Sequence, residues 1–278
     1  MEMPPGGPQL RPVTEDGTAA ERWRRALASW AIPEPILAKA PEDPWALPVA
    51  LFESDQRGPT LSHRRALEAL TLGDNVLDVG AGRCAMSLPL RPPASRIIAV
   101  DGSPAMLANS PADATVLGRW PDVAPQVGTA AVVVCGHVLY NVPDLGPFIK
   151  ALEAAARRRV VIEITQAHPR TRAVEAELWQ HFWKLTRPTG PTWNDAVAVL
   201  RDCGIDPRIE LWQTDERWGF SDLEELVAWM RRTVCLGASR DDEVRAIVLK
   251  HAVRQDGGWR LSGEPRSLAT MWWDVHER

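Results

Sequence analysis

The chain has 278 residues, of which 45% are hydrophobic and 24% charged, and its 32 basic and 36 acidic side chains give a net charge of −4. This composition is typical of a globular protein, excludes a disordered or fibrous chain, and offers no basic surface for a phosphate backbone. The longest apolar run, 130–135, is far below the ~20 residues that cross a bilayer, and the first residues lack the apolar stretch of a secretory signal, so we expect neither nucleic acid nor a membrane as a partner.

The first seventy residues predict a helical segment behind a tail. Residues 1–18 are rich in proline and glycine and show no periodicity, so we expect them to be disordered. An apolar stripe predicts a helix over 18–29, prolines then interrupt the chain, and a further helix is predicted over 61–70. Residues 19–72 therefore form a predicted N-terminal helical segment.

Short β-branched runs then alternate with helical patterns. The predicted helices are 85–90, 104–109 and 145–157, and the predicted strands are 75–79, 96–101, 114–117, 130–135 and 160–165. Alternation of this kind implies a parallel, doubly wound sheet, so the predicted fold class is α/β.

Beyond residue 165 the pattern is mostly helical. We expect strands over 208–214 and 268–273, and helices over 170–185, 194–203, 222–235 and 241–253. The charge run Arg157 to Arg159 is interpreted as the solvated end of the preceding helix, where cations complement the helix dipole.

The cysteines lie far apart in the sequence, at Cys84, Cys135, Cys203 and Cys235. They form neither a Cys-x-x-Cys pair nor a Cys/His cluster at zinc spacing, so we expect no disulfide framework and no metal site. Reduced thiols are typical of the cytoplasm, which is the location that we expect.

A glycine turn follows the first predicted strand, in the segment Val76-Leu77-Asp78-Val79-Gly80-Ala81-Gly82. Glycine lets the backbone turn tightly and approach a ligand, and a helix behind the turn would supply free N–H groups. Gly80-x-Gly82-x-x-Ala85, with Asp101 at the end of the second strand, satisfies the dinucleotide fingerprint. The glycines alone are therefore compatible with any nucleotide cofactor.

Asp78 narrows the cofactor class. A carboxylate two positions before the first glycine would repel a pyrophosphate held over the turn, whereas it would attract a cationic cofactor. S-adenosylmethionine (SAM) is cationic, has a ribose and carries no phosphate. On these residues the chain resembles the class I SAM-dependent methyltransferases, in which acid-x-Gly-x-Gly follows the first strand and an acid ends the second. Cys84 departs from that pattern, since many members have a third glycine there.

The resemblance covers residues 75–165 best and implies more about fold and site. It implies a Rossmann-like sheet of seven strands with an antiparallel last strand, in a SAM-binding domain over 73–278 with helical cover insertions at about 166–205 and 219–255. The implied cofactor contacts are Asp78, Gly80, Gly82, Asp101, Gly102, Met106, Arg119, Trp120, Gly136 and Asn141.

The loop after the fourth strand holds the catalytic candidates, His137 and Tyr140. His137 would lie beside the methyl group and could accept a proton at neutral pH or only shape the pocket, and packing explains Tyr140 nearly as well. We expect Glu163 to be a solvated strand end, and His168 and His181 to be ordinary surface side chains.

The thirteen tryptophans are unusual against four phenylalanines and one tyrosine. Trp179 and Trp183 are spaced to share one helix face, as are Trp23 and Trp30. Core packing is the expected use of both pairs, and an aromatic cleft for a flat or cationic substrate is the alternative.

These patterns predict an enzyme that moves a methyl group from SAM to a small organic acceptor. An NAD(P)-dependent oxidoreductase and a non-catalytic SAM-binding or regulatory protein are the alternatives. The sequence determines neither the acceptor atom nor the oligomeric state.

Overall fold

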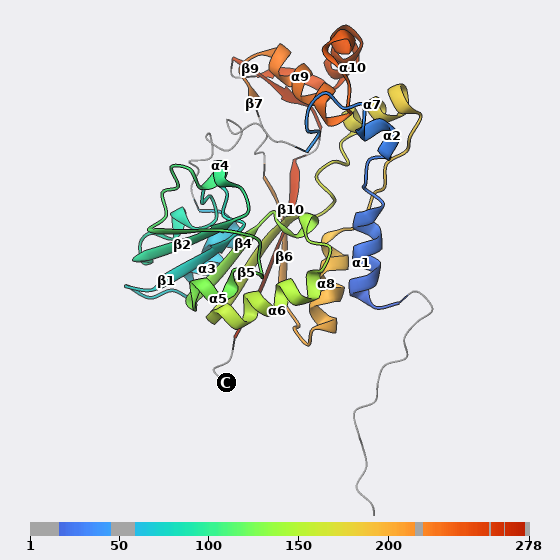
Figure 1. Ribbon diagram of the computed structural model, residues 1–278. Coiled ribbons are helices and arrows are strands. Elements are labelled where there is room, and N and C mark those ends of the chain that lie inside the picture. The colour runs from blue at the N-terminus through green and yellow to red at the C-terminus, as the bar shows by residue number, and fades with distance from the viewer. Residues whose placement is uncertain (1–16, 46–58, 215–218, 256, 264, 276–278) are drawn as a thin grey trace, which may run out of the picture.

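A seven-stranded sheet forms the centre of the larger part of the molecule (Figure 1). The computed structural model describes residues 17–45, 59–214, 219–255, 257–263 and 265–275. Within them the strand order is β3-β2-β1-β4-β5-β10-β6, and β10 runs antiparallel to both of its neighbours, whereas the pairs from β3 to β5 are parallel. The strands are β1 (Asn75–Val79), β2 (Arg96–Asp101), β3 (Ala114–Leu117), β4 (Ala130–Gly136), β5 (Ala156–Thr165), β6 (Arg208–Thr214) and β10 (Arg266–Asp274).

This topology confirms the predicted α/β class and the antiparallel last strand. The strands predicted over 75–79, 96–101, 114–117 and 208–214 have the observed bounds. The central strands β1 and β4 are buried at nearly every position, because helices cover both faces of the sheet and leave no solvated face for polar residues.

Helices form a layer on each face of the sheet (Figure 1). On one face α3 (Leu61–Leu67) and the 3₁₀ turn η2 (Leu88–Leu90) pack on the central strands. The other face is covered by α1 (Ala19–Ala28), α6 (Leu145–Ala155) and α8 (Trp193–Asp202). A capping box of Thr18 and Glu21 begins α1, so the helix predicted over 18–29 is confirmed. Residues 1–16 of the expected tail (1–18) lie outside the described residues.

The helix predicted over 85–90 does not form. Successive turns carry the chain over 82–87 and end in η2. Cys84 has a left-handed backbone (φ +64°), which interrupts a helix, and Pro89 lacks the N–H that a helix interior needs. No α-helix therefore lies behind the glycine turn to supply N–H groups. The other helix in this region, predicted over 104–109, forms as the short α4 (Pro104–Leu107).

The arginine run is also placed differently from the prediction. Helix α6 ends at Ala155, and Arg157 to Arg159 lie in β5. Arg158 pairs with Asp74, and Arg159 is buried with its Nε 2.7 Å from Asp274 of β10. Strand β5 continues through these arginines because it pairs with β10 and because Asp74 and Asp274 neutralise two of the charges. The residues locally resemble the end of a helix.

A smaller unit, here called the cover, lies beyond the carboxyl ends of the parallel strands, on the β5 side (Figure 1). It has its own apolar core, which includes Leu178, Trp179, Met230 and Val248. Its three-stranded sheet was not predicted, because strands of two to four residues give no clear periodicity. The cover comprises α2 (Glu34–Leu37), α7 (Ala173–Trp183), α9 (Leu223–Thr233), η4 (Ala238–Arg240), α10 (Asp241–His251), β7 (Gly219–Phe220), β8 (Ala252–Gln255) and β9 (Gly258–Leu261).

The remaining short elements are α5 (Ala124–Val127) and η3 (Leu139–Asn141). Within the described ranges, none of the helices has both the length and the apolar character that a membrane span requires.

Candidate active site

The glycine turn lies at the carboxyl end of β1, with Gly80 and Gly82 both in the left-handed region (φ +70° and +51°). The N–H groups of Gly80 and Ala81 donate to the Val100 carbonyl of β2 at 2.8 and 3.0 Å. A Cβ on Gly80 would meet Val138 Cγ2 at 2.1 Å, whereas a Cβ on Gly82 would meet no heavy atom within 4 Å. Gly80 is therefore needed for packing, and Gly82 leaves one side of the turn open to a ligand.

Asp101 ends β2 beside this turn. Its Oδ2 accepts the Gly82 N–H at 2.9 Å and its Oδ1 accepts the Ser103 N–H at 2.8 Å. The carboxylate is half-buried, and each oxygen keeps a second lone pair for a ligand hydroxyl. Gly102 is exposed next to it, and Met106 is half-buried in α4. The structure thus brings these three residues together with the glycine turn, and their contact with the cofactor stays a prediction.

Asp78 is buried in β1. Its Oδ2 accepts the Ser87 hydroxyl at 2.6 Å, and within the described chain its Oδ1 has no hydrogen-bond partner. Burial raises the pKa of Asp78 to about 7, the nearby charge of Asp101 raises it further, and the Ser87 hydrogen bond opposes the rise. Two acids that repel each other across one turn favour a cationic ligand over an anionic one, so these residues fit SAM.

Four other predicted cofactor residues lie farther along the carboxyl edge. Trp120 is buried, and its Nε1 donates to the Phe148 carbonyl at 3.3 Å. A Cβ on Gly136 would meet Met86 Cγ at 2.4 Å, so the end of β4 is packed against the segment behind the glycine turn. The side chains of Arg119 and Asn141 are exposed. Contact of any of these four with the cofactor also stays a prediction.

A histidine–glutamate pair occupies the edge between β4 and β5. His137 has a left-handed backbone (φ +59°), and its Nε2 lies 3.0 Å from Glu163 Oε1. The Arg266 guanidinium of β10 lies beside the ring, with Nη2 3.4 Å from Nδ1. The His137 side chain is 36% exposed and that of Glu163 only 7%. The imidazole of His137 therefore reaches solvent, whereas the carboxylate of Glu163 is enclosed.

The prediction that Glu163 is a solvated strand end is wrong. Glu163 pairs in register with Gly136 of β4 and Thr270 of β10, and these neighbours enclose its side chain. Burial alone would raise its pKa, but the hydrogen bond and charge of His137, with smaller contributions from Ser62 and His63, lower it to about 2. Glu163 is thus an ionised, buried carboxylate that orients His137, and only the strand pairing shows it.

Tyr140 lies one turn beyond His137, with its hydroxyl buried. It donates to the Thr165 carbonyl at 2.7 Å, and its ring stacks on Trp23 with centroids 5.8 Å apart. Burial raises the pKa of the phenol above its ordinary value. A hydroxyl that is already bonded and hard to ionise is suited to packing more than to proton transfer.

Three of the four tryptophans that were weighed as a cleft pack in or against apolar cores, as expected of such stripes. Trp23 belongs to the main core, whereas Trp179 and Trp183 belong to the core of the cover. Trp30 is buried and stacks on His168 with centroids 3.7 Å apart.

The two other histidines differ from each other. The prediction that His168 is a surface side chain is wrong. The residue is buried in the loop after β5, between Trp30 and Tyr140. That loop turns inward beneath the cover, which the local sequence does not show. His181 is exposed on α7, 3.7 Å from Glu243, as predicted.

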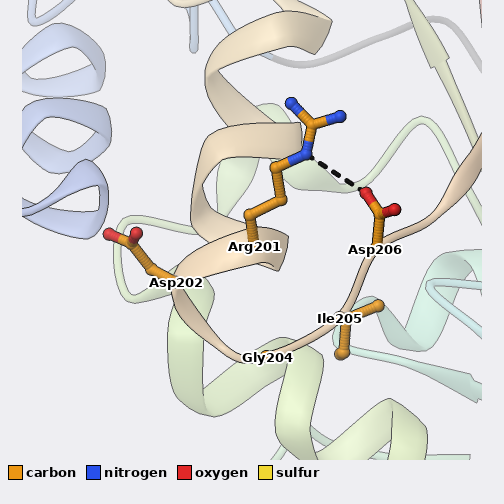
Figure 2. Close-up of a pocket in the computed structure, with 5 residues that line it drawn as sticks. All are labelled: Arg201, Asp202, Gly204, Ile205 and Asp206. Atoms are coloured by element: carbon orange, nitrogen blue, oxygen red, sulfur yellow. Dashed lines mark hydrogen bonds and ion pairs between the residues drawn. The ribbon is translucent and has the colours of Figure 1, made fainter. Parts of the chain in front are cut away.

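A hollow elsewhere on the molecule has no part in this site. Figure 2 shows a hollow where α8 joins β6, lined by Arg201, Asp202, Gly204, Ile205 and Asp206. Because β6 begins there and runs parallel to β5, the hollow lies at the amino edge of the sheet, opposite the glycine turn. No group of three or more His, Cys, Asp or Glu side chains in the described ranges could hold a metal ion.

The strand order, the antiparallel β10 and the acid-flanked glycine turn define a class I SAM-dependent methyltransferase. A family model described as a methyltransferase domain matches residues 52–197, which is more than half of the sequence. The chain belongs to this methyltransferase family, its cofactor is SAM, and the oxidoreductase and non-catalytic alternatives are set aside. Among curated proteins, none matches the chain significantly.

Several solved structures are similar to the chain at low sequence identity. The YcgJ protein from Bacillus subtilis is 13% identical, with 78% of this chain and 99% of that chain covered and a TM-score of 0.47. A SAM-dependent methyltransferase from Archaeoglobus fulgidus is 14% identical, with coverage of 75% and 90% and a TM-score of 0.44. Magnesium protoporphyrin IX methyltransferase from Synechocystis PCC 6803, solved with bound SAH, is 16% identical, with coverage of 61% and 88% and a TM-score of 0.41. The assignment to the fold depends on the strand order and not on these likenesses.

Proposed function

We propose that this methyltransferase acts on a small organic acceptor and that His137 takes the proton which the acceptor loses. The observation that carries the proposal is the 3.0 Å contact between His137 Nε2 and Glu163 Oε1 at the carboxyl edge of the sheet, the edge that also holds the glycine turn. A half-exposed imidazole held by a buried carboxylate is an arrangement suited to general base catalysis.

The size of the acceptor is inferred from the cover and from charge. The cover lies beyond the carboxyl edge, where it would enclose a small molecule and obstruct a polymer (Figure 1). The net charge of −4 gives nucleic acid no attractive surface. In this proposal α2 from residues 19–72, and elements of the insertions at about 166–205 and 219–255, form the cover, whereas α1, α3 and α8 belong to the layers on the sheet.

The cofactor would be held mainly by the backbone and by acids. Gly82 provides the open side of the turn, Asp101 accepts the ribose hydroxyls, and Asp78 supplies negative charge beneath the cationic end. Gly102 and Met106 would border the adenosine. When bound, SAM supplies an electrophilic methyl group on its sulfonium sulfur.

His137 acts on the acceptor in its neutral form. Its Nε2–H donates to the ionised Glu163, and its Nδ1 would accept the O–H or N–H proton that the acceptor loses, in place of the Arg266 contact. Glu163 favours the protonated ring and the neighbouring Arg266 opposes it, so the proton can pass on to water after the transfer.

Replacing His137 tests this function. In His137→Asn the new side chain tolerates the left-handed backbone but cannot act as a base, so kcat should fall about a hundredfold or more while affinity for S-adenosylhomocysteine stays within a few fold. His181→Ala, on the exposed face of α7, is the matched control and should keep full activity. An unchanged kcat in His137→Asn, measured by product mass over a panel of small acceptors, would refute the role of His137.

We further propose a cytoplasmic location, because all four cysteines are free thiols and three of them are buried.

A further inference from the structure

We propose that the acceptor is an acid, a small molecule whose carboxylate or phosphate group is bound by Arg170 and Arg187 beneath the cover. This inference rests on the proposed function and specifies its substrate class. It is drawn from two guanidinium groups that form no direct ion pair with an acid in the described chain, together with the histidine that lies close to both.

Arg170 follows β5 in the loop that leads to α7. Its Nη2 donates to the Pro44 carbonyl at 2.9 Å, and its guanidinium lies 4.9 Å from the centre of the Trp45 ring. Burial lowers the pKa of Arg170 below its ordinary value. None of the ion pairs of the described residues includes it, so a carbonyl and an aromatic ring are its contacts in place of a carboxylate.

Arg187 lies between the sheet and the cover, with the rings of Trp30 and Trp179 at 5.3 and 4.8 Å from its guanidinium carbon. It donates to the backbone carbonyls of Trp30 and Ala31, and in the described chain its buried Nε has no hydrogen-bond partner. Burial lowers the pKa of Arg187, and the charge of Arg170 lowers it further. The two cations thus repel each other, and although Glu175 and Asp43 attract Arg170 through space, neither forms a direct ion pair with it in the described chain.

An arginine of the cover itself shows the usual arrangement. Arg231 is buried, and it lies 3.1 Å from Glu42 and 2.8 Å from Asp241. Buried charges are normally paired in this way, because a guanidinium cannot lose its proton to escape the cost of desolvation. The buried acid nearest to the unpaired cations, Glu175, has its pKa raised by burial and lies 3.8 Å from Arg172. Arg170 and Arg187 therefore have capacity for an anion from outside the chain.

His168 connects this pair to the catalytic loop. Its Nδ1 accepts the backbone N–H of Arg170 at 3.3 Å, its ring stacks on Trp30, and its edge meets Tyr140 at 5.1 Å between centroids. Burial, followed by the charges of Arg170 and Arg187, lowers the pKa of His168 to about 4, so the ring is neutral and its Nε2–H is a donor. The anion site is thus joined through Tyr140 to the loop that carries His137.

The test uses binding, so that it does not depend on turnover. Protein saturated with S-adenosylhomocysteine is titrated by calorimetry and thermal unfolding with benzoate, phenyl phosphate and the neutral benzamide. We expect benzoate or phenyl phosphate to bind at least tenfold more tightly than benzamide, and whichever binds more tightly identifies the acidic group. Arg187→Met should weaken that binding at least tenfold, and Arg96→Met, an exposed arginine at the start of β2, should leave it unchanged.

Two results would overturn the inference. One is equal binding of benzoate, phenyl phosphate and benzamide, and the other is anion binding that survives both Arg187→Met and Arg170→Met. The second substitution also serves if the first variant fails to fold by circular dichroism. Methylation of neutral acceptors without anion binding would refute this inference and leave the proposed function intact. Anion binding with no methylation of any small acceptor would refute the proposed function, and with it the acidic acceptor, and leave Arg170 and Arg187 as an anion-binding site only.

Discussion

The carboxyl edge of the sheet has two halves that are built differently. On the β1–β2 side the candidate cofactor site consists of a glycine turn, backbone N–H groups and two acids within 24 residues of sequence, 78–101. On the β4–β5 side the candidate acceptor site consists of side chains such as His137, Glu163, His168 and Arg187, which come from four separate segments.

Under the proposed function, this difference gives each half its own kind of specificity. A cofactor common to many enzymes can be held by backbone geometry, which depends on few side chains. An acceptor particular to one enzyme has to be recognised by side chains, and the side chains on the β4–β5 side include buried, charged and aromatic groups. Four substitutions test whether the halves are as separate as this comparison implies.

The largest effect is expected from Gly82→Val. A β-branched side chain on a left-handed backbone, placed where the turn is open, should abolish binding of S-adenosylhomocysteine in calorimetry. Gly128→Val is the matched control, because Gly128 has a similar φ of +65° and equally open surroundings but precedes β4 at the amino edge. Both variants should lose similar stability, and equal loss of cofactor binding in both would contradict the assigned role of the turn.

Glu163→Gln should remove a pH-dependent part of the stability. The pKa of Glu163 is about 2 in the fold, below its ordinary value of 4.5. Its contribution to the free energy of unfolding, of order 3 kcal/mol, is therefore complete above about pH 5 and is lost as the pH falls toward 2. Urea unfolding at several pH values should therefore show a weaker loss on acidification in Glu163→Gln than in the wild type. Glu34→Gln, at an exposed residue, is the control. If the loss of stability at low pH is the same in Glu163→Gln as in the wild type, the carboxylate is not ionised in the fold.

Asp101→Ala should weaken cofactor binding more than tenfold, because charge-assisted hydrogen bonds of about 1.5 to 3 kcal/mol are lost. Calorimetry with S-adenosylhomocysteine measures the change, and the exposed Asp122→Ala should bind normally. Since Asp101 also accepts two backbone N–H groups, unfolding has to be measured in parallel. Unchanged affinity in a folded variant would remove Asp101 from the cofactor site.

The smallest effect is expected from Tyr140→Phe. It removes one neutral hydrogen bond to the Thr165 carbonyl, so the free energy of unfolding should fall by about 0.5 to 1.5 kcal/mol and kcat should stay within a few fold. A loss of kcat as large as that of His137→Asn would assign Tyr140 a catalytic role after all.

Local sequence patterns predict most of the arrangement on the β1–β2 side of the sheet. The strands over 75–79 and 96–101 have the predicted bounds because β-branched runs between turn residues specify strands locally. Gly80, Gly82, Asp78 and Asp101 lie together because they close two adjacent parallel strands. The turns over 82–87 are an exception within this half, since the left-handed backbone of Cys84 is not visible in its residue type.

The arrangement on the β4–β5 side depends instead on contacts between segments that are distant in sequence. Glu163 is buried because β4 and β10 flank it, Arg157 to Arg159 continue a strand because β10 and nearby acids pair with them, and His168 is enclosed because α1 ends against its loop. Each of these outcomes depends on partners that are distant in sequence. Periodicity and turn chemistry report only the conformational preference of neighbouring residues, whereas burial and the pairing of charges are set by which distant segments the fold brings into contact.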